Sequence, residues 1–107
     1  ILLIVMTINS PSINLMLLDK FLVMAEFNGI RPIIIINKKD IHYDEIIYNM
    51  YKKIPYDVFE TSIYDDASIK RVLDEIRGYT SVLSGPSGVG KSSIMNYLNN
   101  NKLIKTQ

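Results

Sequence analysis

A glycine-rich stretch of the sequence carries the residue types that bind phosphate. Residues 85–92 read Gly-Pro-Ser-Gly-Val-Gly-Lys-Ser and match the pattern G-x-x-x-x-G-K-[ST]. The glycines allow successive backbone N–H groups to turn inward around phosphate oxygens, and a following helix directs its positive end at the same anion. Lys91 can reach the outer phosphates, and the Ser92 hydroxyl can ligate Mg²⁺. The residues expected to contact the phosphates are Gly85, Ser87, Gly88, Val89, Gly90, Lys91, Ser92 and Ser93.

Two of these expectations have alternatives. Ser93 either adds a contact from the first helical turn or simply faces solvent. The whole stretch could also be a flexible turn with a surface lysine. A strand-like run before it and a helix-like run after it favour the phosphate loop, because the motif requires that context.

A second stretch, Asn37-Lys38-Lys39-Asp40, has the residue types that recognise guanine and fits the pattern N-K-x-D of GTP-binding proteins. The carboxylate of Asp40 would accept hydrogen bonds from guanine N1–H and the 2-amino group, neither of which adenine offers. An unpaired buried polar group costs about 1–3 kcal/mol, enough to separate the two bases by one or two orders of magnitude. Lys38 can lie over the base, and Asn37 can tie this loop to the phosphate loop. The alternative is a polar turn after a strand.

A third contact is expected because guanine O6 needs a hydrogen-bond donor. The residues Glu-Thr-Ser-Ile at 60–63 follow a predicted strand. Ser62 and the backbone amide of Ile63 are therefore candidate donors, on the basis of position alone. The alternative is an ordinary polar strand end.

Alternating strand-like and helix-like segments must position these loops. Continuous apolar runs predict buried strands over residues 1–8 and 33–36, and strands are also predicted over residues 56–60 and 79–83. Apolar residues at helical spacing predict helices over residues 12–28, 44–53, 65–78 and 90–100, the first with a wide apolar face. This repetition predicts an α/β fold with a parallel sheet and flanking helices, and the phosphate loop before the last helix indicates a P-loop NTPase.

The composition fits one small globular domain and excludes several classes. Of the 107 residues, 48% are apolar and 21% charged, and the net charge is +1. These values argue against bulk disorder, a basic nucleic-acid arm or an acidic tail. The chain contains no cysteine, which excludes disulfides and thiolate metal sites within it. Its apolar runs are far shorter than the ~18 residues of a membrane span.

The two nucleotide motifs occur in an unusual order. In ordinary GTP-binding domains the phosphate loop comes first, whereas here residues 37–40 precede residues 85–92. Circular permutation leaves such a site intact if the original chain ends were close, because the same strand ends still meet at one edge of the sheet. With strands numbered along the chain, similarity to GTP-binding domains implies the spatial order 4-1-2-3.

The sequence resembles the circularly permuted GTPases of small ribosomal subunit biogenesis, the ribosome small-subunit-dependent GTPase A family. The resemblance rests on NLMLLDKFLVMAEFNGIRPIIIINKKDI and TSVLSGPSGVGKSSIMNYL in this order. It implies binding of GTP or GDP with Mg²⁺, and GTP hydrolysis during late maturation of the small subunit in the cytoplasm. It further implies 16S rRNA as the partner, a monomer and no membrane. A preceding oligonucleotide-binding barrel and a following zinc domain are also implied, with zinc expected only there.

Residues 1–107 are expected to form only part of such a GTPase domain. The sequence starts at Ile1 inside an apolar run, and a D-x-x-G element, which would hold Mg²⁺ and the γ-phosphate, does not occur in it. We expect that element and the switch threonine after the phosphate-loop helix. The isolated chain should then bind nucleotide weakly and hydrolyse it poorly or not at all. In the whole enzyme, Lys91 is expected to act catalytically by offsetting charge on the outer phosphates.

Two other functions stay open from the residues alone. In one, the chain belongs to an ATP-using P-loop enzyme such as a small kinase, and residues 37–40 form only a turn. In the other, it is a non-catalytic module for nucleotide, protein or RNA binding that keeps the phosphate loop as a relic. Comparing the affinities for GTP, GDP and ATP separates the first from a GTPase, and the hydrolytic activity of a Lys91→Ala variant separates the second.

Overall fold

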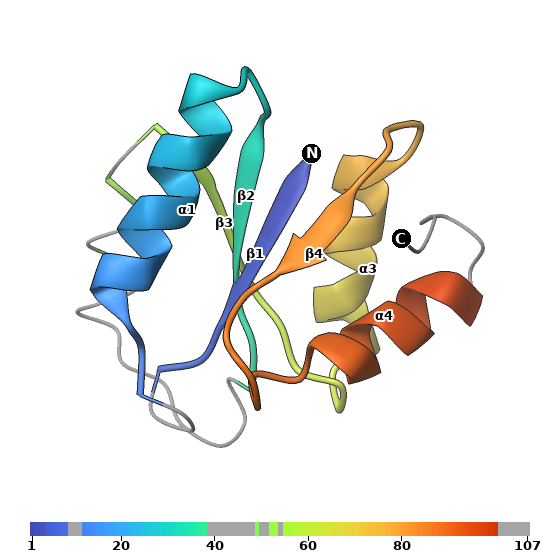
Figure 1. Cartoon of the computed structure of the whole chain (residues 1–107). Helices are drawn as coiled ribbons and strands as arrows, with labels where there is room; N and C mark the ends of the chain where they lie inside the picture. The colour runs from blue at the N-terminus through green and yellow to red at the C-terminus, as the bar shows by residue number, and fades with distance from the viewer. Residues whose placement is uncertain (9–11, 39–48, 50–51, 54, 101–107) are drawn as a thin grey trace.

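A computed structural model of the chain describes residues 1–8, 12–38, 49, 52–53 and 55–100 (Figure 1). The elements follow in the order β1 (Leu2–Met6), α1 (Leu15–Phe27), β2 (Pro32–Ile36), β3 (Asp57–Glu60), α3 (Asp66–Ile76), β4 (Val82–Ser84) and α4 (Lys91–Asn100). This alternation confirms the predicted α/β class. The helix predicted over residues 44–53 lies largely outside the described residues. None of the helices in the described part of the chain has both the length and the hydrophobicity of a membrane span.

The described strands form one parallel sheet in the order β3-β2-β1-β4. Read from the β4 edge, this is the predicted order 4-1-2-3, which is therefore confirmed. β1 is paired with β2 from Leu2↔Pro32 to Met6↔Ile36, and with β4 from Leu2↔Val82 onward. β2 is paired with β3 on its other side. Because the strands are parallel, β2, β3 and β4 all end at one edge of the sheet, the lower edge in Figure 1.

β4 begins at Val82 rather than at residue 79, so the predicted start of the last strand was wrong. Tyr79 and Thr80 have strand-forming side chains, but the Tyr79 N–H closes the turn that leaves α3. Pairing of β4 with β1 runs from Leu2↔Val82, so the strand begins only after this turn has closed.

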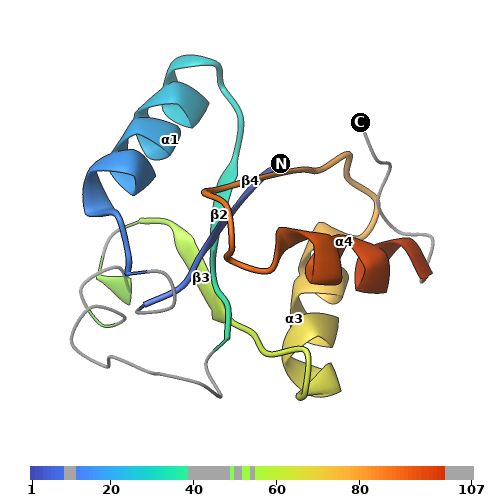
Figure 2. The same ribbon diagram turned by 60° about the horizontal axis from the view of Figure 1, so that its bottom comes forward.

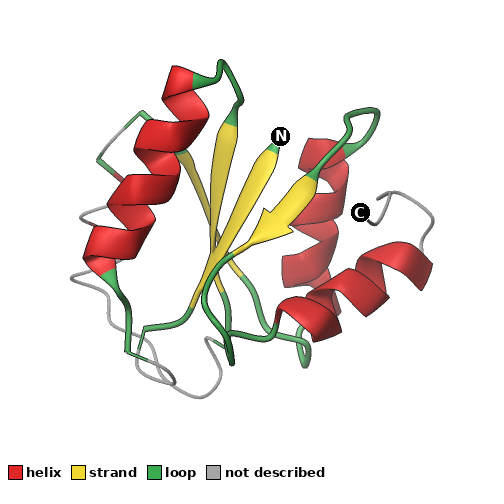
Figure 3. Cartoon of the chain, viewed as in Figure 1, coloured by secondary structure: helices red, strands yellow, loops and turns green. Residues whose placement is uncertain are grey.

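Helices cover both faces of the sheet (Figure 3). Successive strand residues point to opposite faces, so β1 and β2 contribute alternate side chains to two core clusters. The cluster under α3 and α4 contains Leu3, Val5, Ile33, Ile35, Ile69, Val72, Leu73, Ile76, Val89, Ile94 and Leu98. The cluster under α1 contains Leu2, Ile4, Met6, Ile8, Leu18, Leu22, Ala25, Ile34, Ile36 and Val58. Burial on both faces explains why these two strands read as unbroken apolar runs.

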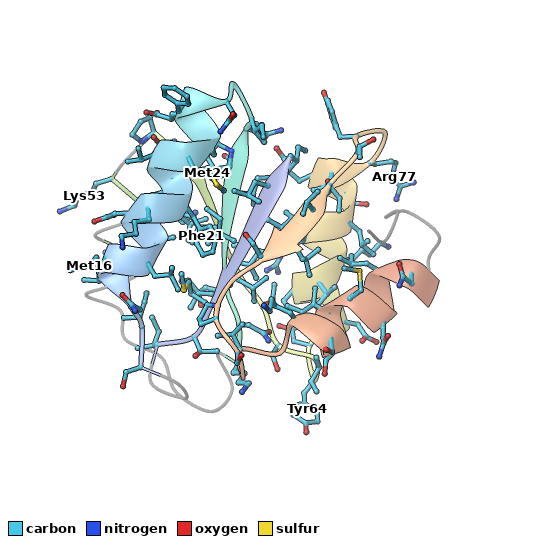
Figure 4. The ribbon with its side chains drawn as sticks, in the orientation of Figure 1. Met16, Phe21, Met24, Lys53, Tyr64 and Arg77 are labelled. Carbon is cyan, nitrogen blue, oxygen red and sulfur yellow. The ribbon has the colours of Figure 1, made fainter. Side chains whose placement is uncertain are left out.

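The apolar face of α1 is only partly covered. Leu18, Leu22 and Ala25 are buried, whereas Met24 is 46% exposed and Met16 is 71% exposed. Figure 4 shows Met16 on the outer side of the helix. The wide apolar face predicted for this helix is therefore present, but only one side of it packs against the sheet.

An ion cluster ties the elements together at the edge of the sheet where β2 and β3 begin. Arg31 precedes β2 and donates to Asp57 at 2.5 Å and to Glu75 of α3. The hydrogen bond to Asp57, followed by the one to Glu75, raises the pKa of the Arg31 guanidinium, which therefore stays charged. All three side chains are more than a third exposed, so the cluster adds little free energy but fixes β2, β3 and α3 relative to one another.

Candidate functional site

Three loops meet at the edge of the sheet where β2, β3 and β4 end, the edge that Figure 2 brings forward. Asn37 and Lys38 follow β2, residues 61–65 connect β3 to α3, and residues 85–90 connect β4 to α4. The predicted phosphate loop thus has the strand–loop–helix context that its motif requires. Hydrogen bonds between side chains and backbone join all three loops, as described below.

The path of the phosphate loop depends on two of its glycines. Gly85 has φ +143°, and a Cβ there would lie 2.2 Å from the Val5 carbonyl oxygen of β1. Gly90 has φ +90°, and a Cβ there would lie 2.4 Å from Nδ2 of Asn37. Both positions therefore exclude a side chain on two grounds, backbone conformation and close approach of another part of the site. The loop has the close-packed, glycine-dependent backbone of a phosphate cradle.

Replacing Gly85 by Ala is expected to lower the free energy of unfolding by about 2–5 kcal/mol, because strain in φ adds to a clash with a strand carbonyl that cannot move aside. Gly29 offers a matched control: its φ is +66°, but a Cβ at this position would have nothing within 4 Å. Gly29→Ala should cost only about 1 kcal/mol. Thermal melting of the two variants measures the difference, and equal shifts would show that the contact with Val5 carries no weight.

The remaining residues of the phosphate loop have distinct environments. Lys91, the first residue of α4, donates from Nζ to the Gly85 carbonyl at 2.6 Å, a bond that spans the loop from its end to its beginning. Ser87 and Gly88 are exposed, as are Ser92 and Ser93 in the first turn of α4. A cavity of about 310 Å³ adjoins this turn and is lined by Leu83, Lys91, Ser92, Met95 and Asn96. The predicted contact residues are thus available to a ligand, with one exception.

The exception is Val89, whose side chain is 1% exposed and belongs to the core cluster under α3 and α4. Its side chain anchors the phosphate loop, and only its backbone could contact a ligand. The Val89 carbonyl already has a partner, since it accepts a hydrogen bond from Nδ2 of Asn37 at 2.8 Å. The Val89 N–H is therefore the group that could serve the predicted contact.

Asn37 joins all three loops through one buried amide. Its side chain donates to Val89 of the phosphate loop, and its Oδ1 accepts from the Thr61 hydroxyl at 2.8 Å. Asn37 is 2% exposed and Thr61 is 1% exposed, so water does not compete for these bonds. Lys38 has φ +59° and donates from Nζ to the Gly88 carbonyl at 2.5 Å. The stretch 37–38 therefore lies directly against the phosphate loop, as the sequence led us to expect of Asn37.

Asp40, the carboxylate of the N-K-x-D pattern, lies outside the described residues, as does Lys39. Its assignment to the base remains a prediction from the sequence. The structure does fix the beginning of the stretch that carries it: Asn37 N–H donates to the Met6 carbonyl at 2.7 Å, which continues the pairing of β1 and β2 to the start of the loop.

Almost every backbone donor of the loop over residues 61–65 has a hydrogen-bond partner. Thr61 N–H donates to Ile36 at 2.9 Å, and Ser62 N–H donates to Oγ of Ser68 at 3.0 Å. The N–H groups of the next two bonded residues turn back to Ser62: that of Tyr64 donates to its Oγ at 3.1 Å and that of Asp65 to its carbonyl at 3.0 Å.

Within the described part of the chain, the Ile63 amide is the one backbone donor of this loop for which no hydrogen bond is found. Ile63 is 44% exposed, so its amide is open to a ligand or to solvent. The two candidates for the third contact therefore differ: the Ser62 amide is occupied, and the Ile63 amide is available. Tyr64, 80% exposed, points away from the body of the molecule beside it (Figure 4).

Sequence reasoning missed two buried hydroxyl residues, Thr61 and Ser68. Thr61 stands directly after a strand at the same edge as the two motifs, and this position could have suggested a role. Ser68 lies three residues after the helix cap Asp65, whose side chain accepts from the Ser68 N–H at 3.3 Å, and this spacing suggests only a capping contact. Neither residue type has a motif of its own here.

The comparisons with known proteins agree with this geometry. A sequence model described as RsgA GTPase matches residues 1–107. The small ribosomal subunit biogenesis GTPase RsgA of Geobacillus sp. (strain WCH70) is 41% identical over 102 residues, which cover 90% of this chain and 35% of that protein. The protein of the same name from Caldanaerobacter subterraneus subsp. tengcongensis is 40% identical over 106 residues, covering 96% and 36%. The chain thus spans about a third of the length of these relatives.

Two solved structures are similar to the whole described fold. YjeQ from Thermotoga maritima superposes with a TM-score of 0.77 at 33% identity, covering 92% of this chain and 37% of that one. YloQ, described as a circularly permuted GTPase, superposes with a TM-score of 0.75 at 36% identity, covering 95% and 38%. The permuted order of the motifs therefore has a counterpart in a related structure.

Proposed function

Because this chain belongs to the RsgA GTPase family, we propose that it forms the guanine-nucleotide-binding part of a GTPase that acts in biogenesis of the small ribosomal subunit. The observation that supports this most directly is the side chain of Asn37. It holds the start of the N-K-x-D stretch, the loop after β3 and the phosphate loop together through buried hydrogen bonds. The start of the stretch expected to read the base is thereby held against the loop expected to bind phosphate, which supports a single nucleotide site.

The phosphates would bind to the loop between β4 and α4. Backbone N–H groups of residues 85–90 and the N-terminal end of α4 favour an anion there. Lys91 would exchange its bond to the Gly85 carbonyl for the outer phosphates, and Ser92 and Ser93 would add hydroxyl groups. The glycine positions, where a Cβ would meet Val5 or Asn37, fit such a cradle. Mg²⁺ would be held by the Ser92 hydroxyl and phosphate oxygens, and when bound it neutralises phosphate charge.

The base would lie between the stretch that begins at Asn37 and the loop over 61–65. The available Ile63 amide would donate to guanine O6, and Asp40 would accept from N1–H and the 2-amino group. Lys38 would cover the ring with its aliphatic stem, for which its place against the phosphate loop is suitable. Ser62 would support the loop rather than touch the base, since both its amide and its hydroxyl already serve the loop.

Hydrolysis and partners belong to the whole protein, of which this chain resembles about a third. We propose that the complete enzyme hydrolyses GTP with Lys91 as a catalytic residue, that a D-x-x-G element and a switch threonine outside this sequence complete the site, and that it acts in the cytoplasm as a monomer on the small subunit and its 16S rRNA. Zinc is expected only in a further Cys/His domain of that protein.

Equilibrium binding to the full-length protein tests the proposed function. GDP is expected to bind at least about tenfold to a hundredfold more tightly than ADP, because an adenine base would leave the Ile63 amide and Asp40 without their partners. Pyrophosphate serves as a control for the phosphate loop alone and should bind more weakly than either nucleotide. Equal affinities for GDP and ADP would contradict a guanine-specific site and favour an ATP-using P-loop enzyme.

A further inference from the structure

Ser68 is a fully buried hydroxyl residue that none of the nucleotide motifs includes. It lies in the first turn of α3 and is 0% exposed. Its Oγ accepts from the Ser62 N–H at 3.0 Å and donates to the Asp65 carbonyl at 2.6 Å. The Ser62 carbonyl, 3.3 Å from the same Oγ, is a second acceptor for the hydroxyl. The hydroxyl therefore satisfies backbone groups at both ends of the turn over residues 62–65.

The bonds of the Ser68 hydroxyl differ from those that the turn makes within itself. Its internal bonds, from Asp65 N–H to the Ser62 carbonyl and from Tyr64 N–H to the Ser62 hydroxyl, close the turn on itself but do not attach it to a helix. The side chain of Ser68 makes that attachment, because α3 packs against the core through Ile69, Val72 and Ile76. The Ser68 hydroxyl thus links the Ser62 end of the turn to a helix that is anchored in the core.

We propose that Ser68 is a positioning residue for recognition of the purine 6-position, an inference that rests on the guanine-specific site proposed above. By binding the Ser62 amide, Ser68 removes one of two neighbouring donors and leaves the Ile63 amide as the group presented to the ligand. By holding Asp65 as well, it sets the direction in which that amide points. A purine with a keto oxygen at the 6-position can accept a hydrogen bond from this amide. A purine whose 6-substituent cannot accept one binds less tightly.

Removing this hydroxyl changes the loop in a defined way. In a Ser68→Ala variant, the Ser62 N–H loses its buried partner, and buried backbone groups rarely remain unpaired. The Asp65 carbonyl loses the hydroxyl but keeps the Ser68 N–H at 3.0 Å. The turn must then move toward water or toward other acceptors. The Ile63 amide loses its fixed orientation, whereas the bonds of Asn37 to Val89 and Thr61 do not involve Ser68 and are kept.

The experiment measures equilibrium affinities of the full-length protein for GDP and two analogues. In 6-thio-GDP a weakly accepting sulfur replaces O6, and in IDP the 2-amino group is absent while O6 is kept. Ser68→Ala is expected to weaken GDP binding about tenfold and to reduce the GDP to 6-thio-GDP affinity ratio by a similar factor, the size of one oriented hydrogen bond. The GDP to IDP ratio, set by Asp40, should change by less than about twofold.

Ser81 provides a matched control. It is 1% exposed, and its hydroxyl has no hydrogen-bond partner among the described residues, so Ser81→Ala also deletes one buried hydroxyl from the same chain. Both ratios should stay unchanged in that variant.

A purely structural role of Ser68 would lower all affinities by the same factor, because only the folded fraction would fall, and the ratios would not move. If Ser68→Ala does not fold, Ser68→Cys keeps the shape with a weakly bonding thiol and should show a smaller loss of the same ratio.

The outcomes separate the inference from the function on which it rests. A wild-type protein that prefers GDP to 6-thio-GDP, with a Ser68 variant that has lost this preference, supports the positioning role. The same wild-type preference with an unchanged ratio in the Ser68 variants overturns the inference and leaves the guanine site in place. A wild-type protein with no preference for guanine nucleotides overturns both.

Discussion

Replacing Lys91 by Ala in the full-length protein is expected to reduce the rate of GTP hydrolysis by about 100- to 1,000-fold. The ammonium group lies at the start of α4 and is held within the phosphate loop by its 2.6 Å bond to the Gly85 carbonyl. Phosphoryl transfer asks little covalent chemistry of a protein, so a positive charge placed at the outer phosphates accounts for a large share of catalysis. Phosphate release under single-turnover conditions measures the effect.

Two further variants test what the loop requires of Lys91 and whether the effect is local. Lys91→Arg keeps the charge but carries a planar, wider group, so it should also lose most activity if the loop accepts a compact ammonium only. Lys70, an exposed lysine on α3, can be replaced by Ala without touching the loops, and hydrolysis should stay unchanged. If Lys91→Ala hydrolyses GTP at the wild-type rate in a folded protein, the phosphate loop of this chain is not the catalytic site.

The architecture was predictable because burial on both faces leaves a strong signal in the sequence. β1 and β2 are apolar at every position, and in the structure each residue of both strands is buried. The strand order was available from the resemblance to GTP-binding domains and is confirmed. The start of β4 was not predictable, because Tyr79 has a strand-forming side chain but its N–H closes the turn that leaves α3.

The candidate site was predictable where glycine and charge mark it, and not where single hydroxyl groups do. The sequence identifies Gly85 and Gly90, and the structure gives each a steric reason. Thr61 and Ser68 act through bonds to residues that are 24 and 6 positions away. A serine or threonine at such positions carries no periodic pattern, because its role depends on which buried polar groups the fold brings beside it. The partner of Thr61 is a side-chain amide and that of Ser68 is a backbone amide, and neither pairing follows from a motif.

The backbone hydrogen bonds of the loop explain why Ser62 and Ile63, predicted together from position, are not equivalent. Both follow β3 and both belong to a polar strand end, so the sequence cannot rank them. In the structure the amide of Ser62 is bound by the buried Ser68 hydroxyl, and within the described residues the Ile63 amide has no such bond. The ranking depends on the placement of α3, which is a property of tertiary packing.

Replacing Asp40 by Asn in the full-length protein is expected to weaken GDP binding by about a hundredfold, through loss of a charge-assisted pair of hydrogen bonds. An amide keeps one acceptor, for N1–H, and places a donor opposite the 2-position. That pattern suits xanthine, which carries an oxygen there, so the variant should bind xanthosine diphosphate more tightly than GDP. The loop should keep its position, because Asn37 and Lys38 are held to the phosphate loop by bonds that do not involve Asp40.

A carboxylate on the surface of α3 supplies the matched control for this reversal. Asp74 is exposed and pairs with Arg77 at 3.1 Å, so Asp74→Asn makes the same chemical change away from the three loops. It should leave the order of GDP over xanthosine diphosphate intact. Affinities for both nucleotides, measured by competition in the two variants, decide the assignment. An Asp40→Asn protein that still prefers GDP would remove this carboxylate from the base site, and guanine selectivity would then have to come from the Ile63 amide alone.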